Sequence, residues 1–177
     1  MPAMTAATPI AHRLEIAEAS DEHQRAIQAI YAHYVLHERC SFEEEAPGVE
    51  EMRARRAEVQ QRGLPYLVAC IGGEVAGYAY ATLYRPRSAY RHTVEDSVYV
   101  KRGLHGRGVG KALLHTVIAR CEAAGFRQMI AVVGDSANIG STRLHESVGF
   151  QRVGTLRNVG FKFGDWIDTV LMQRTLG

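Results

Sequence analysis

An apolar strand pattern that runs directly into a glycine-rich loop constrains this chain more than any other feature. The strand pattern ends at 98–100, the loop contains three alternating glycines within 105–110, and an amphipathic helix pattern covers 109–124. Glycine lacks Cβ and lets a ligand approach the backbone, and the free N–H groups at a helix N-terminus attract anions. The pattern therefore predicts a phosphate-binding turn, with a plain turn before a helix as the alternative.

This loop does not match the two common nucleotide-binding patterns. No Gly-Lys-Ser/Thr follows at the spacing of a Walker loop, and the Gly-x-Gly-x-x-Gly order of a dinucleotide-binding unit is missing. Arg107 and Lys111 place positive charge beside the glycines, where a phosphate would benefit from it.

Composition narrows the class of protein further. The 177 residues, 46% hydrophobic and 23% charged, fit one globular domain, which we expect over 12–177 after a flexible leader at 1–11. A net charge of +2 gives no electrostatic reason to expect a nucleic-acid or membrane partner. Cys40, Cys70 and Cys121 form no Cys-x-x-Cys pair, so we expect no metal site and a reducing, cytoplasmic location.

Hydrophobic periodicity predicts an alternation of strands and helices. The expected elements are a strand at 12–19, helices at 21–38 and 49–62, strands at 66–71, 75–83 and 92–100, a helix at 109–124, a strand at 128–133, a helix at 138–148, and strands at 150–160 and 166–174. Hairpins come first and helical crossovers later, which predicts an α/β fold with a mixed sheet.

Two segments resemble the hallmarks of the GNAT acetyltransferases. HGRGVGKALL (105–114) is similar to their pyrophosphate-binding motif (Gln/Arg)-x-x-Gly-x-(Gly/Ala), with His105 where Gln or Arg is usual. Residues 138–150 are similar to Asn-x-x-(Ala/Ser)-x-x-Leu-Tyr-x-x-x-Gly-Phe, with His145 in place of Tyr. The resemblance covers 12–175 and implies a central mixed, mostly antiparallel sheet flanked by about four helices.

A narrower resemblance is to the phosphinothricin and methionine sulfoximine N-acetyltransferases. It rests on IYAHYV (30–35), SFEEE (41–45), TVEDSVYV (93–100), RLHESVGF (143–150) and GFKFGDWID (160–168). The resemblance implies acetyl-CoA as donor, the α-amino group of a small amino-acid analogue as acceptor, and a homodimer. It also implies the cofactor-binding residues: Val98, Tyr99 and Val100 through their main chain, then His105, Gly106, Arg107, Gly108, Val109, Gly110, Lys111, Asn138 and Ser141.

Glu95 is the predicted general base. It matches the acidic position of the group's motif, and a carboxylate partly buried in a cleft has a pKa raised toward useful values. A solvent-facing strand glutamate is the alternative. Strand alternation places Asp96 on the opposite face, so we do not expect the two to form a carboxylate dyad.

His145 and Asn138 each carry two interpretations. His145 either gives a proton to the leaving thiolate or packs as a helix histidine beside Phe150. Asn138 contacts the cofactor arm, caps the helix that begins there, or does both.

The predicted acceptor-binding residues come from two loops. Arg85, Arg87 and Tyr90 precede the catalytic strand, and arginines there suit a carboxylate or phosphinate, although a solvated basic loop is the alternative. Phe42 and Glu43 lie between the first two helices, a segment that flanks the acceptor pocket in this fold. Trp166 is predicted to anchor a strand, with a substrate contact as the alternative.

Two other functions share the same donor. A protein N-terminus or lysine as acceptor predicts an open groove, and the arginines of the 84–91 loop argue against it. A non-catalytic acyl-CoA sensor fits a chain without an acidic base, and Glu95 is present.

Overall fold

A computed structural model describes residues 13–177, so the predicted leader at 1–11 lies outside the described residues. The elements are β1 (Leu14–Glu18), a 3-10 turn (Asp21–His23), α1 (Gln24–His37), α2 (Val49–Gln61), β2 (Tyr66–Ile71), β3 (Glu74–Leu83), a second 3-10 turn (Ser88–Tyr90), β4 (Thr93–Val100), α3 (Val109–Ala123), β5 (Gln128–Gly134), α4 (Ile139–Ser147), β6 (Gln151–Lys162) and β7 (Asp165–Thr175). The predicted order of strands and helices is confirmed.

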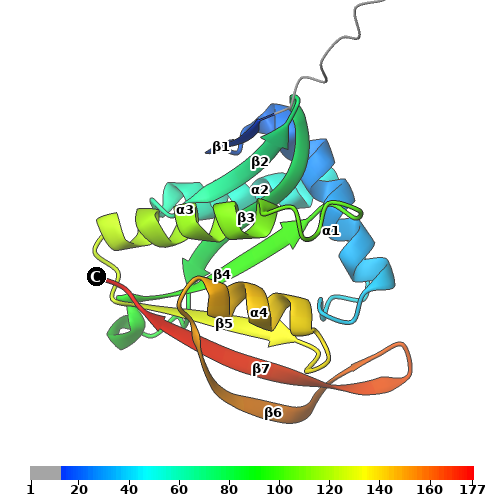
Figure 1. Ribbon diagram of the computed structural model, residues 1–177, viewed down its shortest axis with the longest axis vertical. Coiled ribbons are helices and arrows are strands. Elements are labelled where there is room, and N and C mark those ends of the chain that lie inside the picture. The colour runs from blue at the N-terminus through cyan, green and yellow to red at the C-terminus, as the bar shows by residue number, and fades with distance from the viewer. Residues whose placement is uncertain (1–12) are drawn as a thin grey trace, which may run out of the picture.

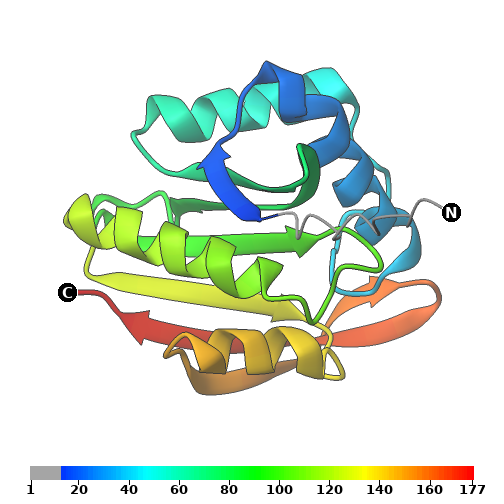
Figure 2. The same ribbon diagram turned by 45° about the horizontal axis from the view of Figure 1, so that its top comes forward.

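The strands form one sheet in the order β1-β2-β3-β4-β5-β7-β6. Within residues 13–177, β4 and β5 are the parallel neighbours and the other neighbouring strands are antiparallel. Helices α3 and α4 cover one face of the sheet, and α1 and α2 lie on the other (Figures 1 and 2). The mixed, mostly antiparallel sheet with flanking helices is thus confirmed.

The sheet opens between its two parallel strands. Pairing of β4 with β5 runs from Thr93 opposite Gln128 to Asp96 opposite Ala131 and stops there. The rest of β4, residues 97–100, keeps β3 as its neighbour but has no β5 partner. Backbone groups along that side of β4 therefore have no strand partner and are satisfied in another way.

Helix α3 is fixed tightly beside this opening. Its apolar side is buried as predicted, with Leu113, Leu114 and Val117 inaccessible to solvent. Gly77 on β3 allows the close approach, because a Cβ there would lie 2.8 Å from the Tyr99 carbonyl oxygen and 3.1 Å from Val109. Within the described part of the chain, no helix has the length and apolar character needed to cross a bilayer.

Candidate active site

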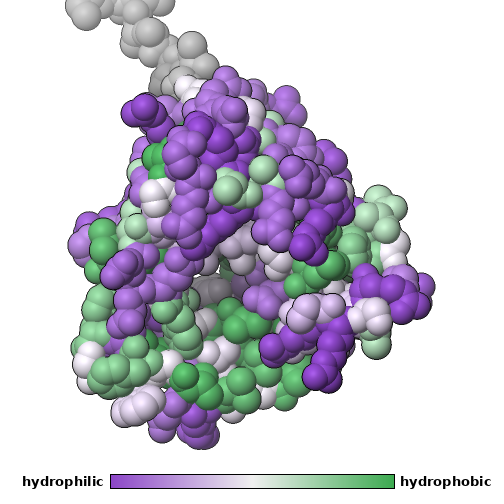
Figure 3. All heavy atoms as spheres, turned by 180° about the vertical axis from the view of Figure 1, so that it is seen from behind, coloured by the Kyte–Doolittle hydropathy of each residue, from purple (hydrophilic) through white to green (hydrophobic). Residues whose placement is uncertain are grey.

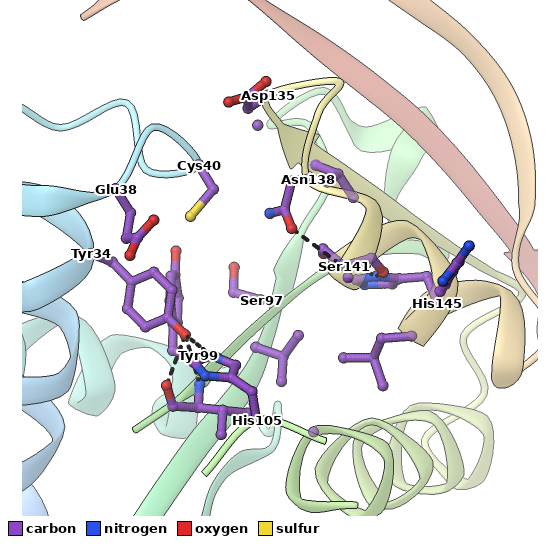
Figure 4. Close-up of a pocket in the computed structure, with 18 of the residues that line it drawn as sticks. Tyr34, Glu38, Cys40, Ser97, Tyr99, His105, Asp135, Asn138, Ser141 and His145 are labelled. Carbon is purple, nitrogen blue, oxygen red and sulfur yellow. Dashed lines mark hydrogen bonds between the residues drawn. The ribbon is translucent and has the colours of Figure 1, made fainter. Parts of the chain in front are cut away.

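A cavity of about 970 Å³ occupies the opening between β4 and β5. Its walls are the end of β4, the glycine-rich loop, the start of α4 and the end of α1 with the segment that follows it (Figure 4). Most of the predicted cofactor-binding residues line it: Val98, Tyr99, Val100, His105, Gly106, Gly108, Gly110, Lys111, Asn138 and Ser141. Arg107 does not line the cavity, and Val109 is buried in the core.

The glycine-rich loop has the conformation that its sequence predicts. Gly106 and Gly108 have φ angles of 75° and 81°, a region that L side chains rarely adopt. Gly108 is the N-cap of α3, so the first free N–H groups of this helix adjoin the cavity. A Cβ on Gly110 would lie 2.9 Å from a methyl of Leu144, so this glycine lets α3 approach α4.

Tyr34 also lines this cavity, whereas the sequence pattern places it only on a helix face. Its hydroxyl donates to the Val100 carbonyl at 2.8 Å and accepts from the Val100 N–H at 3.3 Å. The same hydroxyl lies 2.9 Å from Nε2 of His105. The predicted main-chain contact from Val100 to a cofactor would therefore compete with Tyr34.

Asn138 is the N-cap of α4, where its side-chain oxygen accepts from the Ser141 N–H at 3.2 Å. This agrees with the capping interpretation and leaves its predicted cofactor contact as a prediction.

His145 lies one turn beyond Ser141 and packs edge-on against Phe150 at 5.1 Å. Its Nε2 lies 2.9 Å from Oδ2 of Asp96, and its Nδ1 lies 2.8 Å from the Ser141 carbonyl oxygen. Proton transfer by His145 stays a prediction, and both ring nitrogens already have partners.

Glu95 lies on the opposite face of β4 from Asp96, beside Thr82 of β3. Burial raises its pKa, the neighbouring charge of Asp96 raises it further, and the positive charge of Arg85 opposes this. Arg85 lines a second cavity of about 580 Å³ under α2, with its guanidinium 4.9 Å from the centre of the Tyr84 ring. The charge of Arg85 thus acts on Glu95, although Glu95 itself lines neither cavity.

The predicted contact Glu43 already has two protein partners. Arg55 donates to its two carboxylate oxygens at 2.6 and 3.1 Å, and the Tyr31 hydroxyl donates at 2.6 Å. The hydrogen bond from Arg55 is the main cause that lowers the pKa of Glu43. Phe42 packs on β6, where a Cβ on Gly160 would lie 2.5 Å from its ring. Neither residue lines either cavity.

The remaining predicted acceptor residues lie at the surface. Arg87 precedes the second 3-10 turn, and Tyr90 within it packs edge-on against Tyr84 at 5.7 Å.

The prediction that Trp166 anchors a strand is wrong. Its side chain is 66% exposed and touches Phe161 on the neighbouring strand, because the alternation of β7 turns Ile167 inward instead.

A lysine that sequence reasoning missed fixes the segment between α1 and α2. Nζ of Lys162 is buried and donates to the carbonyl oxygens of Glu38 and Ser41 at 2.9 and 2.6 Å. These contacts hold Cys40 against Gly134 at the end of β5. No local pattern could have revealed a contact across 124 residues.

Across residues 13–177, no group of three His, Cys, Asp or Glu side chains could hold a metal ion.

The family follows from comparison with known proteins. Residues 22–150 match the model of the acetyltransferase (GNAT) family, so this chain belongs to that family and is an N-acetyltransferase. It is 60% identical over 156 residues to phosphinothricin N-acetyltransferase of Alcaligenes faecalis, covering 88% of this chain and 79% of that one. It is 37% identical to the L-methionine sulfoximine/L-methionine sulfone acetyltransferase of Salmonella typhimurium, covering 85% and 88%.

A solved structure shares the fold closely. The phosphinothricin acetyltransferase of Sinorhizobium meliloti, crystallised with acetyl-CoA, superposes with a TM-score of 0.90 at 44% identity, covering 93% of this chain and 89% of that one. The predicted family and fold are thereby confirmed.

Proposed function

We propose that this chain transfers the acetyl group of acetyl-CoA to the α-amino group of a small amino-acid analogue of the phosphinothricin or methionine sulfoximine type. The donor would lie in the larger cavity, with its pyrophosphate on the N–H groups at the start of α3 and its thioester beside Val98. The positive-φ glycines and the unpaired side of β4 are the features that support this placement.

The opposite charges of Glu95 and Arg85 support the choice of acceptor. An amino acid presents an ammonium and a carboxylate a few ångströms apart, and these two side chains offer the opposite charges at one end of β3 and β4. Arg55 and Arg62, which line the same cavity, are paired with Glu43 and Glu58. Arg85 has no such salt bridge among the described residues, so its guanidinium is available to a carboxylate or phosphinate.

The reaction places one demand on each group. The ammonium must lose a proton before it can attack, and Glu95 takes this proton directly or through one water. The amine nitrogen then bonds to the thioester carbon, and a main-chain N–H of β4 at Val98 stabilises the developing oxyanion. The C–S bond breaks, coenzyme A leaves as a thiolate, and the proton that the attacking nitrogen must still lose ends on this thiolate.

An acceptor panel tests this proposal. Coenzyme A release is measured with acetyl-CoA and, separately, phosphinothricin, methionine sulfoximine, methionine sulfone, free amino acids, a polyamine and a short peptide. We expect turnover with the amino-acid analogues. Preference for the peptide would overturn the acceptor class while keeping the donor, and acetyl-CoA binding without turnover on any acceptor would favour the sensor.

The β6–β7 hairpin supports a homodimer as part of this proposal. β6 is an edge strand, and large apolar side chains are exposed along the hairpin: Val153, Leu156, Val159, Phe161, Phe163 and Trp166. In Figure 3 the hydrophobic surface gathers at the end of the molecule formed by β6 and β7, whereas the α1–α2 end is hydrophilic. An apolar patch of this kind on a globular domain marks an interaction site, and a second copy would cover it.

Trp166→Lys is expected to weaken self-association by at least about thirtyfold, because truncating a central interface tryptophan costs about 2 kcal/mol or more. Light scattering after size exclusion measures the mass across a dilution series. Leu36→Lys, which changes an exposed leucine on α1, is the matched control and should leave the mass unchanged. Identical masses for the unaltered protein and the Trp166 variant at every concentration would refute this interface.

A further inference from the structure

The pair Asp96–His145 lies where the two walls of the larger cavity meet. Asp96 is the last β4 residue that is paired with β5, so it marks the point at which the strands separate. His145 lies on α4, the helix that carries Asn138 and Ser141 along the opposite wall. The contact between them joins the body of α4 to β4, while Arg174 of β7 donates to the carbonyl oxygen of the C-cap residue Val148.

Both side chains are sealed from solvent. The side chain of Asp96 is 1% exposed and that of His145 is 4% exposed. The second carboxylate oxygen of Asp96, Oδ1, is buried and has no hydrogen-bond partner among the described residues. A carboxylate in this state depends on its one partner, because an unpaired buried charge is costly.

Both nitrogens of the His145 ring are engaged in hydrogen bonds within the protein. A carbonyl oxygen can only accept, so Nδ1 must donate its proton to the Ser141 carbonyl. Nε2 then donates to Asp96. Burial lowers the pKa of His145, but the charge of Asp96 and the hydrogen bonds to Asp96 and Ser141 raise it overall, in keeping with a ring that donates from both nitrogens.

We propose that Asp96 and His145 are positioning residues that hold α4 against β4 and keep the acetyl-CoA cleft at its working width, and that His145 does not protonate the leaving thiolate. The inference rests on the proposed function, because it assumes that acetyl-CoA occupies the larger cavity. A displaced wall would weaken the contacts from Asn138, Ser141 and β4 to the donor, whereas the chemistry at Glu95 on the other face would proceed once the donor is bound.

The test separates donor binding from the chemical step. Acetyl-CoA affinity is measured by calorimetry, and kcat is measured at saturating donor. His145→Gln is expected to raise the Kd and KM for acetyl-CoA about tenfold or more, because a buried group left without its hydrogen-bond partner weakens an equilibrium by roughly that factor. Its kcat should stay within about threefold. Asp96→Asn, which can still donate to a neutral imidazole, should restrict the loss of affinity to about threefold.

A double variant is needed because His145→Gln alone leaves the buried Asp96 carboxylate without its charged partner, which could unfold the protein. Asp96→Asn combined with His145→Gln replaces the ion pair by a neutral amide pair and removes the imidazole altogether. We expect it to bind acetyl-CoA more tightly than His145→Gln alone and to keep its kcat. Glu146→Gln, an exposed change on the same helix, is the control.

Either of two results overturns the inference. A kcat at least about a hundredfold lower in the double variant, with Kd unchanged, would make His145 the proton donor, since general acid catalysis contributes about 10²–10⁴-fold. An unchanged Kd and kcat in His145→Gln would remove any role for the pair. Absence of acetyl-CoA binding by the unaltered protein would instead overturn the proposed function.

Discussion

Glu95→Gln is expected to lower kcat by about 10²–10⁴-fold, the range that a positioned general base contributes. The change keeps the size of the side chain but removes its ability to accept a proton from the ammonium. Glu95 is half-buried on β4, and glutamine fills the same space, so acetyl-CoA affinity and thermal stability should not change. Steady-state kinetics with calorimetry on the same preparations make this measurement. Glu15→Gln, on the exposed side of β1, is the matched control.

The pH profile gives the same prediction a second readout. Burial raises the pKa of Glu95, so the side chain stays protonated at pH values where an ordinary glutamate is ionised. A base works only when it is deprotonated, so kcat/KM should rise with pH. The midpoint of this rise should lie above the ordinary glutamate pKa of about 4.3. Glu95→Gln should lose this rise. If the variant keeps both the rise and the rate, another group removes the proton.

Gly134→Ala is expected to destabilise the fold by about 1–3 kcal/mol, as overpacking does in other cores. A Cβ at this position would collide with the carbonyl oxygen of Cys40 and lie 2.9 Å from its carbonyl carbon. The backbone there cannot move aside easily, because Lys162 holds the carbonyl oxygens on either side of Cys40. At about 2–4 °C per kcal/mol for a chain of this size, the melting temperature should fall by roughly 2–12 °C.

Gly154→Ala is the control for this substitution. Gly154 lies on β6, where an added Cβ would meet no atom within 4 Å, and its φ is not in the left-handed region. Its melting temperature should stay near that of the unaltered protein. Equal melting temperatures for the two variants would mean that the segment between α1 and α2 is free to shift away from β5.

Elements with strong local patterns could be predicted from the sequence. The strand predicted at 66–71 has the observed bounds, because a continuous apolar run ends at a Gly-Gly turn. The helix predicted from residue 21 begins instead as a 3-10 turn and becomes α-helical at Gln24. Helix ends depend on tertiary packing as well as on capping residues, which explains such small differences.

The site residues likewise fall into those that a local sequence pattern predicts and those that only the tertiary structure brings together. The glycine-rich loop is local, so its place at the cavity follows from the order of neighbouring residues. The partners Asp96–His145 and Tyr34–Val100 are 49 and 66 residues apart, and only the order of the strands brings them together. Glu43 illustrates the limit: its segment suggests an acceptor contact, whereas its carboxylate is bound to Arg55 and Tyr31.

The strand order has a consequence for how this protein is made. β7 is inserted between β5 and β6, so the sheet cannot be completed until the ribosome has released residues up to 175. Lys162, which secures the segment after α1, emerges only with the end of β6. During synthesis the nascent chain therefore exposes the side of β5 that β7 will cover. Such unpaired strands invite aggregation, so chaperone demand should be greatest until β7 has emerged.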